Sequence, residues 1–137
     1  MARNNFKMNG AEVVDIIHTI EDVTIVAKQN KPNEVVCPYC GNTTSRMRYT
    51  RPRIYKDSPL LFSKDTYLSL KRVEAKCECG KSFTVASNLV KENSRMTQNL
   101  VSFISFLLTN PYNMTNEEMA IEAGVSEKTI RRAKKGV

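Results

Sequence analysis

Tryptophan is missing from this chain of 137 residues, and aromatic residues of all kinds make up only 7% of it. Proteins that bind single-stranded nucleic acid stack bases on exposed aromatic rings, so this scarcity argues against single-stranded DNA or RNA as a partner. Only Tyr49 and Tyr55 lie among basic residues, where a base could stack. Any hydrophobic core must therefore be built from Ile, Leu, Val and Met.

Long apolar segments and catalytic carboxylate patterns are missing as well. No apolar run reaches the roughly 20 residues needed to cross a bilayer, and the N-terminus lacks the basic-then-apolar pattern of a secretion signal. These absences predict a cytoplasmic protein, with no membrane partner, whose thiols stay reduced. No trio of carboxylates has catalytic spacing, so we expect neither an enzyme nor a small-molecule substrate.

Acidic residues are outnumbered, because 21 basic residues face 14 acidic ones and give a net charge of +7. The excess is concentrated in residues 23–95, which carry fourteen basic and six acidic groups. Such a distribution favours a polyanion as partner. The alternative is an ordinary solvated surface.

The four cysteines form two short motifs, CPYCG and CECG. Two thiolates separated by two residues can wrap around one side of a tetrahedral metal ion, and the glycine that follows lets the backbone turn tightly. The C-x-C spacing of the second motif is tighter and less common, but it occurs in zinc ribbons. Four sulfur ligands leave no open position, so they predict one structural Zn²⁺ ion. The expected ligands are Cys37, Cys40, Cys77 and Cys79.

Two disulfides, or an iron centre with the same ligands, are the alternatives to zinc. A reducing compartment and the C-x-C spacing argue against the disulfides. His18 is the only histidine, and it lies far from both cysteine motifs in the sequence. We interpret it as a surface or half-buried residue and not as a ligand.

The first two thirds of the chain are predicted to form a zinc ribbon with a helix before it. In residues 11–20, apolar side chains recur at the spacing of one helical face. Residues 23–27, 66–76 and 81–86 read as strands, and Asp57 to Pro59 as a turn. The predicted fold is α+β: a small β-rich zinc ribbon over residues 1–92, followed by a three-helix bundle over residues 93–137.

The C-terminal bundle is predicted to contain a helix-turn-helix in residues 116–135. Such a motif needs a small residue where its helices touch, and here Ala120 fills that position. Gly124 follows four residues later, as a turn residue that tolerates positive φ. Thr115 and Glu118 match a capping box for the first helix, and Ser126 can cap the second. Apolar residues in 97–108 predict the remaining helix.

The second helix of this motif is predicted to enter the major groove of DNA. Base edges are met by its first turn, and five basic residues follow between positions 128 and 135. Arg is the usual bidentate partner of guanine, and Lys more often neutralises phosphate. The candidate contacts are Lys128, Thr129, Arg131, Arg132, Lys134 and Lys135. The alternative is a packing unit of three helices with a solvated basic end.

A basic strand in residues 46–56 supplies a second set of candidate DNA contacts. Alternate residues of a strand project to one face, so neighbouring arginines can approach the same phosphate backbone. The candidates are Arg46, Arg48, Arg51 and Arg53. An ordinary exposed basic strand is the alternative.

Several features follow one another along residues 15–135: CPYCG, a basic strand, an Asp-x-Pro turn, a strand leading into CECGKSF, and helices ending in EEMAIEAGVSEKTIRRA. In this order they resemble the N-terminal region of ISL-three family insertion-sequence transposases. The resemblance implies a zinc ribbon and a helix-turn-helix that bind the terminal repeats of a transposon during DNA transposition. The acidic catalytic domain of such transposases is missing, because the chain stops at Val137. We therefore expect binding without cleavage.

The expected function is sequence-specific binding of double-stranded DNA, with a second copy of the chain as a further candidate partner. One alternative is a stand-alone transcriptional regulator that binds an operator, for which a palindromic site is typical. The other is a protein-interaction adaptor in which the ribbon docks a partner and DNA binding is weak at physiological salt.

Overall fold

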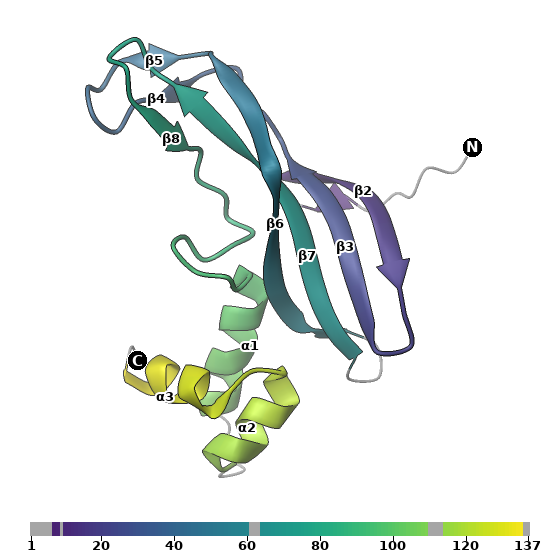
Figure 1. Ribbon diagram of the computed structural model, residues 1–137. Helices are drawn as coiled ribbons and strands as arrows, with labels where there is room; N and C mark the ends of the chain where they lie inside the picture. Colours follow the sequence, from purple (N-terminus) through teal and green to yellow (C-terminus); the bar gives the residue numbers. More distant parts are fainter. Residues whose placement is uncertain (1–6, 9, 61–63, 110–113, 136–137) are drawn as a thin grey trace.

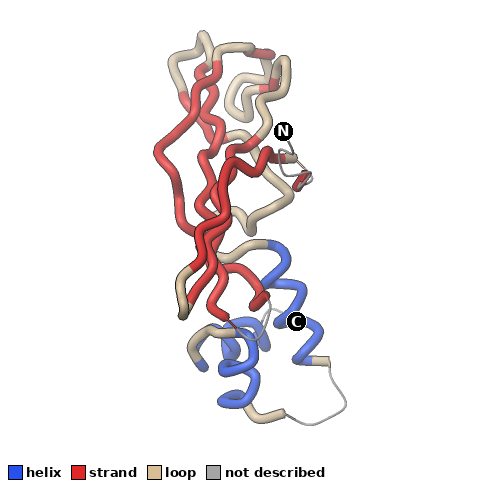
Figure 2. The backbone as a smooth tube through the Cα atoms, turned by 90° about the vertical axis from the view of Figure 1, so that its right-hand side faces the viewer, coloured by secondary structure: helices blue, strands red, loops and turns tan. Residues whose placement is uncertain are grey.

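The computed structural model describes residues 7–8, 10–60, 64–109 and 114–135. A long, curved β-sheet forms the body of the molecule, and three short helices lie at one end of it (Figure 1). A quarter turn of the view places the strands along the long axis, with the helices below them (Figure 2). No helix among the described residues has the length and apolar character required to cross a membrane.

Six strands make one mixed sheet in the order β1-β2-β3-β7-β6, with β8 paired to β7 outside this path, and β4 pairs with β5 alone. The neighbours β3 and β7 run parallel, whereas the other pairs are antiparallel. The strands are β1 (Lys7–Met8), β2 (Ala11–His18), β3 (Asp22–Gln29), β4 (Val35–Val36), β5 (Thr43–Thr44), β6 (Met47–Leu60), β7 (Lys64–Lys76) and β8 (Ser82–Thr84). The helices are α1 (Gln98–Leu108), α2 (Asn116–Ala123) and α3 (Glu127–Lys135).

The predicted combination of a small zinc ribbon and a three-helix bundle is wrong. The body is a six-stranded mixed sheet, and the cysteine motifs occupy only its far end (Figure 1). The helices are short, and α1 packs against β6 as well as against α2 and α3. The fold is α+β, and the sheet dominates it. Sequence periodicity missed this because the central parallel pairing joins strands that are far apart in the chain.

The helix predicted for residues 11–20 is also wrong, because most of this segment is strand β2. A register shift, typical of a β-bulge, lies between Val13 and Asp15 where β2 pairs with β3. The extra residue separates the inward-facing Val13 and Ile16 by three positions, which imitates the spacing of a helix. Val and Ile are β-branched and favour strands, so composition outweighs the apparent period.

The turn predicted from Asp57 to Pro59 is a strand as well. These residues lie inside β6, where a second register shift separates Asp57 from Leu60. Proline is tolerated at such an irregularity because its missing N–H does not interrupt a regular ladder. The strands predicted in residues 23–27, 66–76 and 81–86 are confirmed in β3, β7 and β8.

One face of the sheet carries the first hydrophobic core. Leu68 and Leu70 of β7 are fully buried at its centre. Val90, from the segment that follows β8, covers them and is 1% exposed. The other buried members are Ala11, Ala27 and Tyr55, with Ile25 and Leu89 packed against the cluster. The segment between β8 and α1, which contains Leu89 and Val90, therefore packs on the sheet and covers this core.

A buried arginine fixes that covering segment to the sheet. Arg72 of β7 is 2% exposed, and its Nε donates to Oε1 of Gln29 at 3.1 Å. Its Nη1 donates to the Tyr55 hydroxyl at 3.0 Å, and its Nη2 to the Val85 carbonyl at 3.0 Å. The Glu92 carboxylate completes the set at 2.9 Å. A buried charge is tolerated only when it is paired and hydrogen-bonded, and Arg72 meets both conditions.

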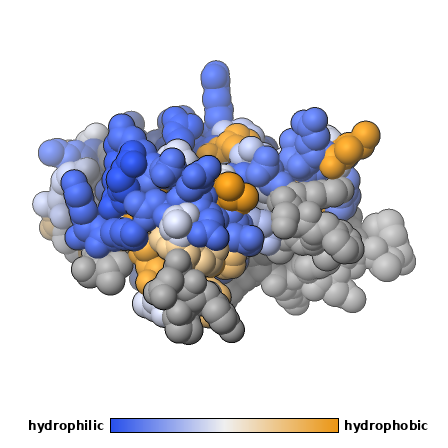
Figure 3. All heavy atoms as spheres, turned by 90° about the horizontal axis from the view of Figure 1, so that it is seen from below, coloured by the Kyte–Doolittle hydropathy of each residue, from blue (hydrophilic) through white to orange (hydrophobic). Residues whose placement is uncertain are grey.

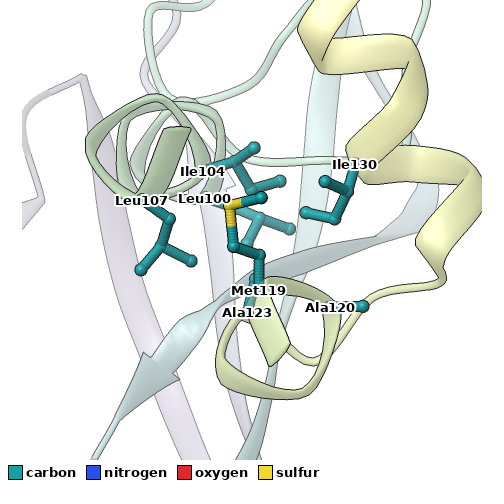
Figure 4. Packing of buried hydrophobic residues seen from close by; sticks show 7 residues of the cluster. All are labelled: Leu100, Ile104, Leu107, Met119, Ala120, Ala123 and Ile130. Atoms are coloured by element: carbon teal, nitrogen blue, oxygen red, sulfur yellow. The ribbon is translucent and has the colours of Figure 1, made fainter. Parts of the chain in front are cut away.

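The three helices surround a second core (Figure 4). Leu100 and Ile130 are fully buried, and Ile104 and Met119 have at most 3% of their surface exposed. The remaining members are Leu107, Ala120 and Ala123. Every helix contributes to this cluster, so the position of α3 depends on α1 and α2.

The residues that lead into α1 are hydrogen-bonded to β6, at the outer edge of the sheet. Thr97, which caps the helix by accepting from the Leu100 N–H, donates its own N–H to the Lys56 carbonyl at 2.9 Å. Its hydroxyl donates to the buried Asp57 carboxylate at 2.6 Å. The Lys56 N–H in turn donates to the Arg95 carbonyl at 2.6 Å. The helices therefore begin from a fixed point on the sheet.

Candidate metal centre and basic surface

The cysteines lie in two backbone knuckles, each of which connects two antiparallel strands. Residues 37–41 connect β4 to β5, and residues 77–80 connect β7 to β8. In both knuckles the final glycine donates its backbone N–H to the carbonyl of the first cysteine, at 3.0 Å. Gly41 and Gly80 have positive φ of 79° and 91°, which other residues adopt only at a cost. The tight turn predicted at each glycine is therefore confirmed, but the glycine N–H donates to a backbone carbonyl and not to a sulfur.

The two knuckles bring all four cysteine sulfurs to within 4.8 Å of one another. The Sγ atoms of Cys37 and Cys79 are 3.8 Å apart, and those of Cys40 and Cys77 are 3.4 Å apart. Zn–S bonds of about 2.3 Å would place tetrahedral sulfurs about 3.8 Å apart. Cys37 and Cys77 are buried, whereas Cys40 and Cys79 are exposed. The four cysteines can therefore hold one metal ion.

The surroundings shift the pKa values of the two buried thiols in opposite directions. Burial raises the pKa of Cys37, but hydrogen bonds with the backbone of Cys40 and Tyr39 outweigh it and lower the pKa to about 7. The backbone of Cys79 lowers the pKa of Cys77, but the Cys40 sulfur and burial together raise it. Metal ligands must be thiolates, so the lowered pKa of Cys37 favours metal binding near neutral pH.

Polar contacts attach the first knuckle to the sheet. The Thr44 hydroxyl donates to the Lys76 carbonyl at 2.8 Å, and the Lys76 N–H donates to the Arg46 carbonyl at 2.9 Å. Few large apolar side chains are buried here, since Val36 and Tyr39 are 62% and 59% exposed. His18 is exposed at the end of β2, as predicted, and is not part of the cysteine cluster.

The predicted local features of α2, the turn and α3 are confirmed. Thr115 and Glu118 form the capping box, and the hydrogen bond from the Thr115 N–H lowers the pKa of the Glu118 carboxyl. Gly124 ends α2 in the left-handed conformation, with φ of 70°. Ser126 accepts from the Thr129 N–H at 3.2 Å and so caps α3. Ile130 points into the helical core, which turns the opposite face of α3 outward.

The exposed surface of α3 carries all five of the predicted basic residues. Lys128, Arg131, Arg132, Lys134 and Lys135 are all exposed. None of the five forms an ion pair with another residue in the described part of the chain. Thr129 is half-buried, and its hydroxyl is hydrogen-bonded to that of Ser126. Seen from the helical end, most of the described surface is hydrophilic, and apolar patches lie between the polar residues (Figure 3).

The arginines predicted on the basic strand are spread along the sheet and not gathered with α3. Arg46 precedes β6 near the cysteine knuckles, and the other three lie within β6. Arg48 is already paired, because its Nη2 and Nε donate to the Glu74 carboxylate at 2.8 and 3.0 Å. Arg53 lines a cleft between β6 and the segment of residues 91–95. The predicted arginines therefore have different surroundings: Arg48 is in an ion pair, whereas Arg53 lines a cleft.

Lys91 and Arg95, which were not predicted as contacts from the sequence, lie beside α3. Both are exposed, and they line the same groove as Arg132. Two basic residues in the short segment KENSR were the only signal for them, and it is a weak one.

In comparisons with known proteins, the chain matches no protein-family model, no curated protein and no solved structure.

Proposed function

We propose that this chain binds double-stranded DNA and reads its sequence with α3. One observation carries the proposal: five exposed cations share α3 and have no acidic partner among the described residues, while the apolar side of the helix is buried. A short helix that projects an unpaired basic face fits the major groove, where Arg reads guanine and Lys neutralises phosphate. The turn at Gly124 holds this helix against α2.

The metal proposed for the four cysteines is zinc, with a structural role. Four thiolates at the observed separations suit its tetrahedral coordination and leave no position for a substrate. When bound, zinc would cross-link the two knuckles and would not take part in a reaction. The cysteines and the glycine turns would then fix the far end of the sheet.

The resemblance to ISL-three family transposases supports a terminal repeat of a transposon as the DNA target. Both the order of the motifs and the basic final helix agree with such a repeat-binding region. The activity proposed for this chain is binding without strand cleavage. A stand-alone regulator would use the same helix on an operator, and the symmetry of the preferred site distinguishes the two.

The test is selection of bound sequences from a random duplex pool at about physiological salt, where the Debye length is roughly 8 Å. We expect an enriched motif, asymmetric for a transposon end and palindromic for a dimeric regulator. Arg131→Ala or Arg132→Ala should weaken binding to the selected site by about 1–3 kcal/mol and relax one base preference. No enrichment, with weak binding that disappears as salt is added, would contradict the proposal.

Conservative variants separate base reading from charge. Arg131→Lys and Arg132→Lys keep the positive charge but lose the planar, bidentate donor. At a position that reads a base, the lysine variant should lose selectivity almost as fully as the alanine variant. At a position that touches only phosphate, the lysine variant should bind like the unmodified chain.

A further inference from the structure

Two clefts meet at residues 91–95, which we call the ridge. The first, of about 620 Å³, lies between the ridge and residues 52–55 of β6. The second, of about 510 Å³, lies between the ridge, α1 and α3. Lys91, Asn93, Ser94 and Arg95 line both clefts. The ridge therefore joins the edge of the sheet to the flank of α3 in one continuous surface.

The charge of this surface is positive and uncompensated. Arg53 lines the first cleft, Arg132 lines the second, and Lys91 and Arg95 belong to both. All four are exposed, and within the described residues none of them forms an ion pair. Glu92 is the one acidic residue among the described lining residues, and Arg72 neutralises it.

The ridge is held in place by hydrogen bonds at both ends. The Lys91 N–H donates to the Met96 carbonyl at 3.0 Å, which closes the loop on itself. The Arg95 carbonyl accepts from the Lys56 N–H of β6 at 2.6 Å. At its middle, the Glu92 carboxylate accepts from Arg72 and from the Ser87 N–H. Backbone fixed in this way carries its cations at set positions beside α3, so little order must be gained on binding.

From these contacts we infer that the ridge binds the phosphate backbone of duplex DNA that flanks the bases contacted by α3. This inference rests on the proposed function. Arg132 lines the groove that Lys91 and Arg95 share, so DNA on α3 extends over the ridge. Cations beside a groove-inserted helix meet phosphates, which carry no sequence information but add affinity. Arg53 continues the contact along β6.

The test compares two duplexes that contain the sequence selected by the unmodified chain. The short duplex ends at the selected motif, and the long one extends beyond it by about 10 base pairs on each side, roughly one helical turn. The double variant Lys91→Ala/Arg95→Ala should lose at least tenfold in affinity for the long duplex and much less for the short one. Its slope of log K against log salt should fall by about 0.9 for each phosphate that the variant no longer neutralises. Arg53→Ala should show a smaller loss of the same kind.

Lys71→Ala is the matched control for Arg53→Ala, because each variant removes one exposed cation. Lys71 lies on β7 between the buried Leu70 and Arg72, so it projects from the opposite face of the sheet. It should leave both affinity and salt slope unchanged. Circular dichroism and metal content verify that each variant is folded.

Two results would overturn the inference while the proposed function stands. One is unchanged affinity and salt slope in the double variant, and the other is a changed base preference, which would make the ridge a reader of bases. If the unmodified chain selects no duplex sequence, the proposed function fails and the inference fails with it. A loss confined to the long duplex, with the selected motif preserved, supports the inference.

Discussion

At one end of the sheet four cysteine sulfurs converge, whereas at the other end seven buried side chains fill the space between three helices. The knuckle end leaves Val36 and Tyr39 mostly exposed and is joined to the sheet by polar contacts. The helical end buries Leu100 and Ile130 completely. The two ends of the sheet are therefore stabilised differently: one has a cysteine cluster that can hold a metal ion, and the other has a hydrophobic core.

The difference follows from how much chain each end contains. Two knuckles and two short hairpins cannot enclose a core, and small units of this kind depend on a metal or a disulfide. The three helices pack on one another, and α1 and α2 also contact β6, so this end buries enough apolar surface to be stable without a metal. We therefore expect the two ends to respond to different perturbations, so that a change that breaks one end leaves the other intact.

Removal of the metal should have the largest effect, and it should be confined to the knuckle end. Structural zinc contributes about 10–16 kcal/mol of apparent binding free energy in small zinc-dependent peptides. After chelation, amide hydrogen exchange should accelerate in residues 35–46 and 76–84 and remain slow in α1. Because protons compete for the thiolates, metal affinity should also fall as the pH is lowered. Equal acceleration in the helices would mean that the two ends are not independent.

Ile104→Ala should produce the opposite pattern. Ile104 is 2% exposed within the helical core, and truncating a buried Ile costs about 2–5 kcal/mol. Denaturant unfolding should report this loss, and metal content should stay at one ion per chain. Ile121→Ala is the control, since Ile121 is 73% exposed and its truncation should cost less than about 0.5 kcal/mol. Metal loss in Ile104→Ala would contradict the separation of the two ends.

The smallest expected difference is in the stability lost when alanine replaces one of two glycines with positive φ, one at each end of the molecule. Gly124 and Gly41 both have positive φ, so alanine costs about 1–2 kcal/mol of backbone strain at either position. A Cβ at Gly41 meets nothing within 4 Å, but at Gly124 it lies 3.3 Å from the Asp65 carboxylate and 3.4 Å from Lys56. Gly124→Ala should therefore lose more stability in thermal unfolding than Gly41→Ala. Equal losses would show that the turn is not closely packed against the Lys56–Asp65 ion pair.

Local features of both ends could be predicted because the sequence encodes them within a few residues. Cysteine spacing identified the cluster, and Thr115 with Glu118 identified the start of α2. The centre of the sheet could not be predicted, because the parallel pairing of β3 with β7 joins strands separated by three others. The bulge after Val13 gave β2 the apparent period of a helix.

Charged residues were the least predictable from sequence. Arg72 reads as one more basic residue of an alternating strand, yet it is buried and bonded to Gln29, Tyr55 and Glu92. Arg48 of β6 pairs with Glu74, which is 26 positions away in the chain but lies on the neighbouring strand β7. Whether a basic side chain is exposed or forms an ion pair depends on which strand lies beside it. Neither composition nor periodicity contains that information.

The parallel pairing of β3 with β7 has a consequence for the rate of folding. Lys28 and Lys71 are partners in the ladder although 43 positions separate them in the chain. A metal that first joins the two knuckles shortens the path between them to about 15 residues, which lowers the entropy cost of closing that loop by about 1 kcal/mol. A newly made chain would therefore form its central sheet several times faster when metal is present during synthesis.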